Sequence, residues 1–175
     1  MTSKANRELH ARTVRYVTDE LDTRASGRVG LIAPPRTSRP DLMAAVAHAL
    51  LVRLPEDKRC LILTERGHLL MCVVDSLTEY GGRPRTFQQG ARTESRYVLA
   101  VLREYAAEAG GIEALNIGAT VMFTSRAGRL RPLLSTYRSL CERAPEVPMV
   151  SIFENAEAAA EFADDAGHPV DVRTL

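Results

Sequence analysis

The sequence predicts an α/β protein with a mostly parallel central sheet of about four or five strands, helices on both faces of the sheet, and an extra helix at the N-terminus. Short apolar runs, such as 28–34 and 58–66, alternate with longer segments in which apolar residues recur every three or four positions. This alternation is typical of parallel sheets, because a crossover helix must return the chain to the edge from which the next strand starts.

The chain has 175 residues, of which 45% are hydrophobic and 26% are charged, as in ordinary globular domains. The sequence contains neither an internal repeat nor a linker-like stretch. We therefore expect one domain over 1–175, with a helix in 1–25 and the sheet core in 27–167.

The N-terminal segment, about 3–24, predicts an amphipathic helix. Leu9, Tyr16, Val17 and Leu21 recur on one side, and charged residues occupy the rest. This apolar side could cover the core of the same chain, or it could contact a partner protein or a second copy. The pattern favours neither alternative.

Three elements are expected in the next part of the chain: a strand at 28–34, a helix at 38–54 with Pro40 in its first turn, and a buried strand at 58–66. The segment 67–82 could be a helix or the second arm of a hairpin. We favour the helix, because Gly81 and Gly82 form a good helix stop.

The second half continues the alternation. Pro84 indicates a weak edge strand at 83–90. The pattern then predicts helix 93–111, strand 118–125, helix 129–144, strand 148–153, helix 155–167, and a tail, 168–175, that could be a strand or coil.

The composition makes several classes of function improbable. Net charge is +1, aromatic residues are 5% and Trp is absent, so a nucleic-acid surface is not expected. Cys60, Cys72 and Cys141 lack metal-ligand spacing and indicate reduced thiols, so we expect neither a metal nor a cofactor. With no apolar leader or membrane span, the sequence predicts a cytoplasmic protein without membrane contact.

Hydroxyl and basic side chains follow the expected strands. A shared carboxyl edge would gather them into a crevice for a small anionic ligand, and its candidate residues are Arg36, Ser38, Arg39, Arg66, Arg96, Thr124, Ser125 and Arg126. The alternative stays open, because the same residue types are ordinary helix caps and solvated loop residues.

No catalytic motif occurs in the chain. The sequence lacks GxGxxG after a strand, GxxxxGK[ST] and GxSxG. His68 is the one histidine expected at a strand end, and it could act as a base with Cys60 or Ser125, although we favour a plain loop histidine because nothing local fixes that geometry. No catalytic residue is assigned, and catalysis is left open but not favoured.

Three stretches in the region 118–165 resemble the C-terminal half of STAS-like domains, the anti-sigma-factor antagonist and SpoIIAA/Sec14-like group: "ATVMFTSRAGRLRPLLSTYRSL", "VPMVSIF" and "ENAEAAAEFADD". The antagonists' phosphorylatable serine turn has no match, since the second expected strand runs into "TERGHLL". The resemblance implies a non-enzymatic regulatory module that acts through protein contact or a small ligand.

Two functions follow as expectations. The first is a non-enzymatic cytoplasmic regulatory or protein-interaction module, STAS-like, with a protein partner or itself as a homodimer. The alternative is a small Rossmann-like enzyme or binding protein for a phosphorylated or carboxylated metabolite, held by arginines at the carboxyl ends of the strands.

Overall fold

The computed structural model describes residues 4–23, 27–33, 35, 37–64, 67–79, 85–86, 96–101, 116–124, 138–165 and 171–174. The described helices are α1 (Lys4–Thr23), α2 (Arg39–Arg53), α3 (Gly67–Glu79) and α7 (Ala156–Asp165), with a further helical stretch at 138–143. The strands are β1 (Arg28–Ile32), β2 (Arg59–Thr64), β3 (Arg85–Thr86), β4 (Tyr97–Val101), β5 (Ile117–Thr124), β6 (Met149–Phe153) and β7 (Asp171–Thr174).

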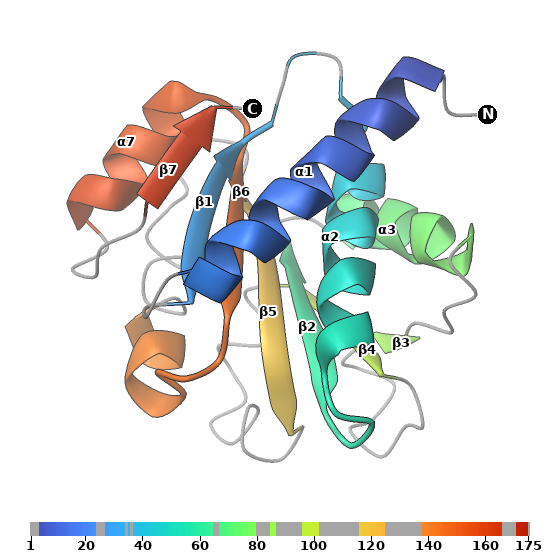
Figure 1. Cartoon of the computed structure of the whole chain (residues 1–175), viewed down its shortest axis with the longest axis vertical. Coiled ribbons are helices and arrows are strands. Elements are labelled where there is room, and N and C mark those ends of the chain that lie inside the picture. The colour runs from blue at the N-terminus through green and yellow to red at the C-terminus, as the bar shows by residue number, and fades with distance from the viewer. Residues whose placement is uncertain are drawn as a thin grey trace.

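The strands form one seven-stranded sheet in the order β3-β4-β2-β5-β6-β1-β7 (Figure 1). Every described strand pair is parallel. The α/β class and the parallel sheet are therefore confirmed. The sheet is larger than expected, because β4 replaces part of a predicted helix and the C-terminal tail pairs as β7.

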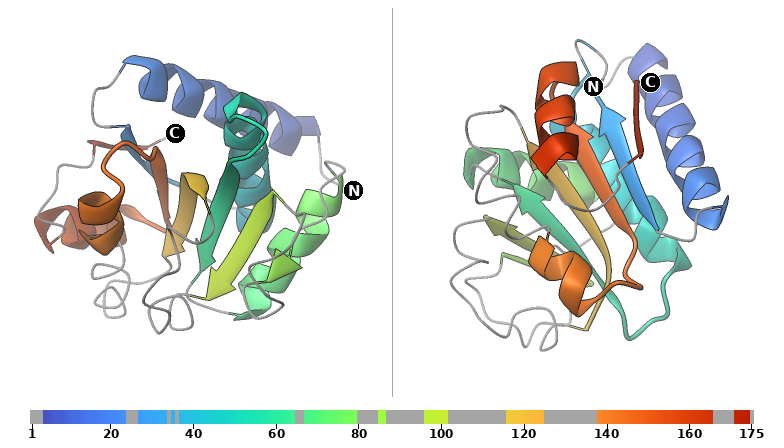
Figure 2. Two further views of the ribbon diagram at one scale, coloured as in Figure 1. Left: turned by 90° about the horizontal axis from the view of Figure 1, so that it is seen from below. Right: turned by 90° about the vertical axis from the view of Figure 1, so that its left-hand side faces the viewer.

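Helices cover both faces of the sheet (Figure 2). The helices α1, α2 and α3 bury one face, on which Ile62, Val121 and Ile152 are fully covered. The other face packs Leu61, Met122 and Phe153 against α7 and the helical stretch at 138–143. Successive residues of a strand thus pack into the cores on opposite faces of the sheet. For this reason each strand is a continuous apolar run in the sequence, rather than an alternation of apolar and polar residues.

Two expectations for individual elements were open or need correction. Residues 67–79 are the helix α3, so the hairpin alternative is wrong. The predicted helix over 93–111 is wrong at Tyr97–Val101, which form β4 beside β2. Apolar residues in "YVLAV" fit a buried strand as well as a helix face, and the tertiary partner β2 decides between them.

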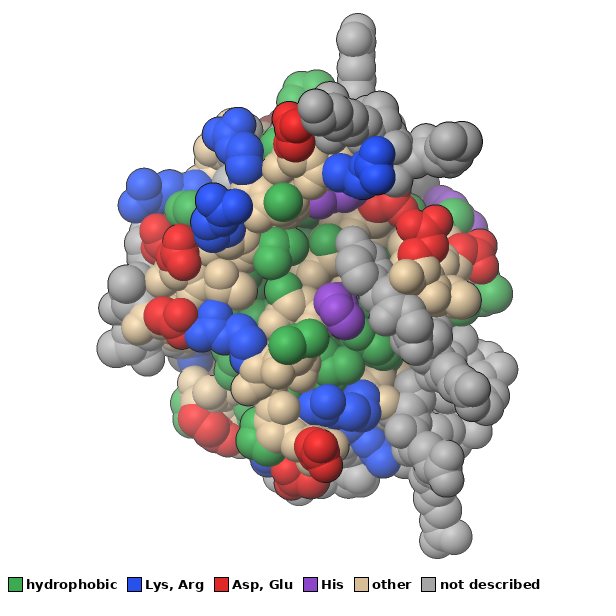
Figure 3. Space-filling view, turned by 45° about the vertical axis from the view of Figure 1, so that its right-hand side comes forward, with side chains coloured by type: hydrophobic (Ala, Val, Ile, Leu, Met, Phe, Trp, Pro, Cys, Tyr) green, Lys and Arg blue, Asp and Glu red, His purple; other side chains and the backbone are tan. Residues whose placement is uncertain are grey.

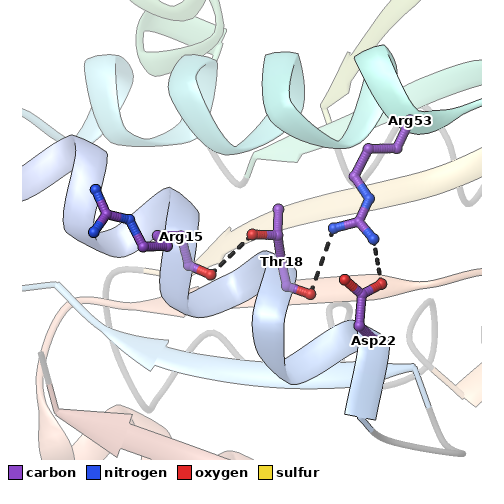
Figure 4. A network of polar contacts seen from close by, with 4 residues as sticks. All are labelled: Arg15, Thr18, Asp22 and Arg53. Carbon is purple, nitrogen blue, oxygen red and sulfur yellow. Dashed lines mark hydrogen bonds and ion pairs between the residues drawn. The ribbon is translucent and has the colours of Figure 1, made fainter.

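The N-terminal helix α1 belongs to the core of this chain. It packs against α2 and β1, and Val17 is 1% exposed while Thr13 is fully buried. At its C-terminal end, Arg53 of α2 forms an ion pair with Asp22 and approaches the carbonyl oxygen of Thr18 (Figure 4). The apolar side of α1 therefore covers the core of the same chain, which was one of the two alternatives that the sequence left open.

Candidate functional site

The carboxyl ends of β5, β6 and β1 meet at one edge of the sheet. The backbone N–H of Glu154 donates to the carbonyl of Thr124 at 3.1 Å, and the N–H of Ala33 donates to the carbonyl of Phe153 at 2.9 Å. The residues that directly follow these three strands therefore lie next to one another. This arrangement confirms that the exits of β1 and β5 share an edge, and the parallel β2 ends at the same edge beside β5.

The turn between β1 and α2 carries two hydroxyl groups at a helix N-terminus. Ser38 is the N-cap residue of α2, but its hydroxyl makes no capping hydrogen bond. The Oγ1 atom of Thr37 is buried and has no hydrogen-bond partner among the described residues. Buried hydroxyls usually have a partner, so the Thr37 hydroxyl leaves unused hydrogen-bonding capacity at the positive end of α2.

The guanidinium of Arg39 lies over the exits of β5 and β6. Its Nη2 is 2.5 Å from Oε1 of Glu154, and its Cζ is 5.7 Å from the centroid of the Phe123 ring. The two contacts hold this cation at the carboxyl edge, directly after the turn that contains Thr37 and Ser38. Sequence reasoning missed Glu154, although it follows a buried strand as the predicted residues do.

Acidic groups already complement part of this positive charge. Glu154 pairs with Arg39, and Asp41 lies in the first turn of α2, where it accepts a hydrogen bond from Ser76 Oγ at 2.7 Å. Pro40 removes one backbone N–H from the same turn. An anion at this edge must therefore compete with Glu154 for Arg39, which limits its affinity.

A second feature of the edge lies between β2 and β5. The chain runs from β2 to β3, on one side of this pair, and from β5 to β6, on the other side, so the two connections diverge from adjacent strands. Such topological switch points are where open α/β sheets bind ligands. Thr64 and the predicted residue Thr124 end these strands and are 0% and 1% exposed.

Arg96 does not belong to this edge. It directly precedes β4, so it lies at the amino end of the sheet. Its guanidinium donates to the backbone carbonyls of Leu51, Leu54, Pro55 and Lys58 at 2.8–3.4 Å. We expected Arg96 beside the other candidates because the sequence predicted a helix over 93–111. In the structure, its side chain instead binds backbone carbonyls at the C-terminal end of α2.

The structure separates His68 from Cys60. His68 is exposed in the first turn of α3, beyond the carboxyl end of β2, whereas Cys60 lies near the amino end of that strand. Thr64 lies four positions after Cys60 along the strand, which corresponds to about 13 Å. Burial also raises the pKa of the Cys60 thiol to about 12, so the pairing of these two residues as nucleophile and base is wrong.

The other candidates, Arg36, Arg66, Ser125 and Arg126, lie outside the described residues. Within the described part of the chain, no group of three or more His, Cys, Asp or Glu side chains could hold a metal ion. The described helices include none with the length and apolar character that crossing a membrane requires.

Comparison with known proteins gives a likeness of fold. No family model and no curated protein matches the sequence. Among solved structures, the chain is similar to the crystal structure of a hypothetical ATP-dependent RNA helicase from Sulfolobus tokodaii, with a TM-score of 0.56 and 9% sequence identity. The match covers 94% of this chain but only 57% of that chain, and at this identity it shows a shared α/β fold.

Proposed function

We propose that this chain is a non-enzymatic α/β module that binds a small anionic ligand at the carboxyl edge of its sheet. The observation that carries the proposal is the turn before α2. There the buried Thr37 hydroxyl has no partner among the described residues, the Ser38 hydroxyl makes no capping hydrogen bond, and Arg39, whose guanidinium reaches Glu154, follows at the helix N-terminus. Hydroxyl donors and a guanidinium at such an end suit a phosphate or carboxylate.

The proposal favours binding over catalysis. The turn "APPRTSRP" (33–40) follows the first strand, where a phosphate-binding loop of a nucleotide hydrolase would carry GxxxxGK[ST]. It contains no lysine, and Arg39, one of its two arginines, is paired with Glu154. The ATP dependence named for the helicase of similar fold is therefore not proposed for this chain.

The test is a thermal-shift series with phosphate, nucleotides and organic acids on the intact chain and two variants. A bound anion should raise the melting temperature, since ligand at 100 times its dissociation constant stabilises the folded state by about 2.7 kcal/mol. Arg39→Gln should weaken binding by about 1 to 3 kcal/mol. Glu154→Gln should strengthen it, because this change frees the guanidinium and removes the competing carboxylate.

Arg53→Gln provides the control, because Arg53 also carries a partly exposed, ion-paired guanidinium but lies at the opposite end of α2. This variant should bind anions as the intact chain does. If no anion raises the melting temperature, or if Arg39→Gln and Arg53→Gln behave alike, the carboxyl edge is not an anion site.

A regulatory role through protein contact is the second candidate. The stretch that resembles STAS-like domains spans β5, β6 and α7, and it includes the Thr124–Glu154 contact of the proposed site. An anion bound there could thus change a surface that a protein partner, or a second copy, recognises. Sedimentation of the intact chain with and without the anion identified above tests this candidate, and an unchanged mass would oppose self-association.

A further inference from the structure

A groove of about 260 Å³ lies between α1 and α2. Small side chains create it where the two helices face each other: Ala11 from α1, and Ala45 and Ala49 from α2. Val14 adds a further apolar wall. Drug-sized ligands occupy cavities of roughly 300–1,000 Å³, so an occupant of this groove must be small.

His10 lines this groove and has an unsatisfied nitrogen. The residue is 7% exposed, and its Nε2 atom is buried without a hydrogen-bond partner among the described residues. A buried imidazole nitrogen without a partner costs free energy, because it has given up water and gained nothing in return. A ligand atom that hydrogen-bonds to Nε2 would recover this cost.

The polar groups that line the groove are basic or neutral. They are Arg7 and His10 from α1 and His48 from α2, and none of the described residues that line the groove is acidic. The ring of His48 is held in place, since its Nδ1 lies 2.8 Å from Oη of Tyr97. Figure 3 shows histidine side chains among apolar ones on this side of the molecule, with basic side chains nearby.

We propose that the groove between α1 and α2 binds a small monocarboxylate with an apolar body. The alanines and Val14 would contact the apolar body, Arg7 would pair with the carboxylate at the rim, and His10 would donate a hydrogen bond from Nε2. Because Nε2 is covered in the empty groove, the imidazole must turn toward the ligand about its side-chain bonds.

The electrostatic surroundings of His10 agree with this chemistry. Burial lowers its pKa below 6.5, and the nearby carboxylate of Asp41 only partly opposes this effect. A bound carboxylate would favour the protonated ring and raise the pKa again. Arg7 and His48 line the same groove, so the carboxylate of a bound ligand would lie near these two groups as well.

The experiment uses benzoate as the probe, benzamide as its uncharged match, and the intact chain. Benzoate should raise the melting temperature, should shift the imidazole NMR signals of His10, and should raise the pKa measured from those signals. Benzamide should do none of these at the same concentration. A benzamide effect as large as that of benzoate would overturn the proposal, because the carboxylate would then contribute nothing.

Variants locate the site. Ala49→Leu fills the groove and should abolish the benzoate response, whereas Ala160→Leu makes the same change at an exposed position of α7 and should not. Arg7→Gln should weaken binding about tenfold, the usual loss for a charge-assisted contact. Arg12→Gln, at another exposed position of α1, should have no effect. If Ala49→Leu does not fold, the comparison of Arg7→Gln with Arg12→Gln still tests whether benzoate binds in the groove.

The variant Arg39→Gln distinguishes binding in this groove from binding at the carboxyl edge. It should leave benzoate binding in the groove unchanged. A response that is lost in Arg39→Gln but kept in Arg7→Gln and Ala49→Leu would assign benzoate to the carboxyl edge and overturn the groove proposal. Absence of any benzoate response would also overturn it, without bearing on phosphate or nucleotide binding at the other site.

Discussion

At the scale of single residues, the side chain of Arg96 makes a group of hydrogen bonds to the backbone whose contribution to stability can be measured. Its guanidinium donates to four carbonyl groups at and just beyond the C-terminal end of α2, where the last carbonyls of a helix have no following turn to bond to. We expect Arg96→Met to lower the free energy of unfolding by about 1 to 3 kcal/mol, as measured by urea denaturation.

Arg53→Met is the matched control for Arg96. Arg53 ends the same helix, but its side chain is 42% exposed and its partner Asp22 is 58% exposed, so solvent weakens the ion pair. Its loss should cost less than about 1 kcal/mol. Equal losses for the two variants would contradict a structural role for the Arg96 fork.

The three cysteines should differ sharply in reactivity. Cys60 is fully buried with its pKa raised to about 12, and Cys141 is 3% exposed, whereas Cys72 is exposed on α3. A thiolate is the reactive form, so native protein treated with iodoacetamide at pH 8 should be alkylated at Cys72 first. Mass spectrometry after a short reaction checks this order, and addition of urea should make all three cysteines react. Early labelling of Cys60 would show that the start of β2 opens readily.

At the scale of elements, the start of β5 depends on a glycine. A Cβ atom at Gly118 would lie 2.8 Å from Cβ of Lys58 and 3.1 Å from the methyl groups of Leu54. These residues belong to the turn that joins α2 to β2, so the turn and β5 can approach only if the position lacks a side chain. We expect Gly118→Ala to destabilise the fold by about 1 to 3 kcal/mol, as overpacking does.

Gly67, the first residue of α3, is the control for Gly118. A Cβ atom there meets nothing within 4 Å, so Gly67→Ala should be neutral, or stabilising by up to about 1 kcal/mol through a less flexible unfolded chain. Thermal unfolding of the two variants provides the comparison. Similar melting temperatures would mean that the β5 start can move away from the turn at little cost.

At the scale of the whole molecule, periodicity predicted the sheet and most helices because each buried strand carries its own apolar run. It failed at Tyr97–Val101, where five apolar or aromatic residues suit a helix face and a strand alike, and only the partner β2 resolves the choice. That error also misplaced Arg96. Glu154 and the groove at His10 depend on contacts between segments far apart in the sequence, which local patterns do not contain.

The place of α1 in the whole molecule leads to the last prediction. Its apolar side buries Val17 against α2 and β1, so this side is not free for a partner in the folded chain. Val17→Ala should therefore lower the free energy of unfolding by about 1 to 3 kcal/mol, the scale of a core truncation, whereas the exposed Arg12→Ala should change it by less than about 0.5 kcal/mol.

Removal of residues 1–25 extends the same argument to the entire helix. The shortened chain would expose the apolar surface of α2 and β1 that α1 covers, so it should lose its cooperative thermal transition and should aggregate in sedimentation experiments. If α1 served mainly to join two copies, the shortened chain would instead be a monomer with an unchanged melting temperature. The two outcomes exclude each other, and the burial of Val17, Thr13 and His10 predicts the first.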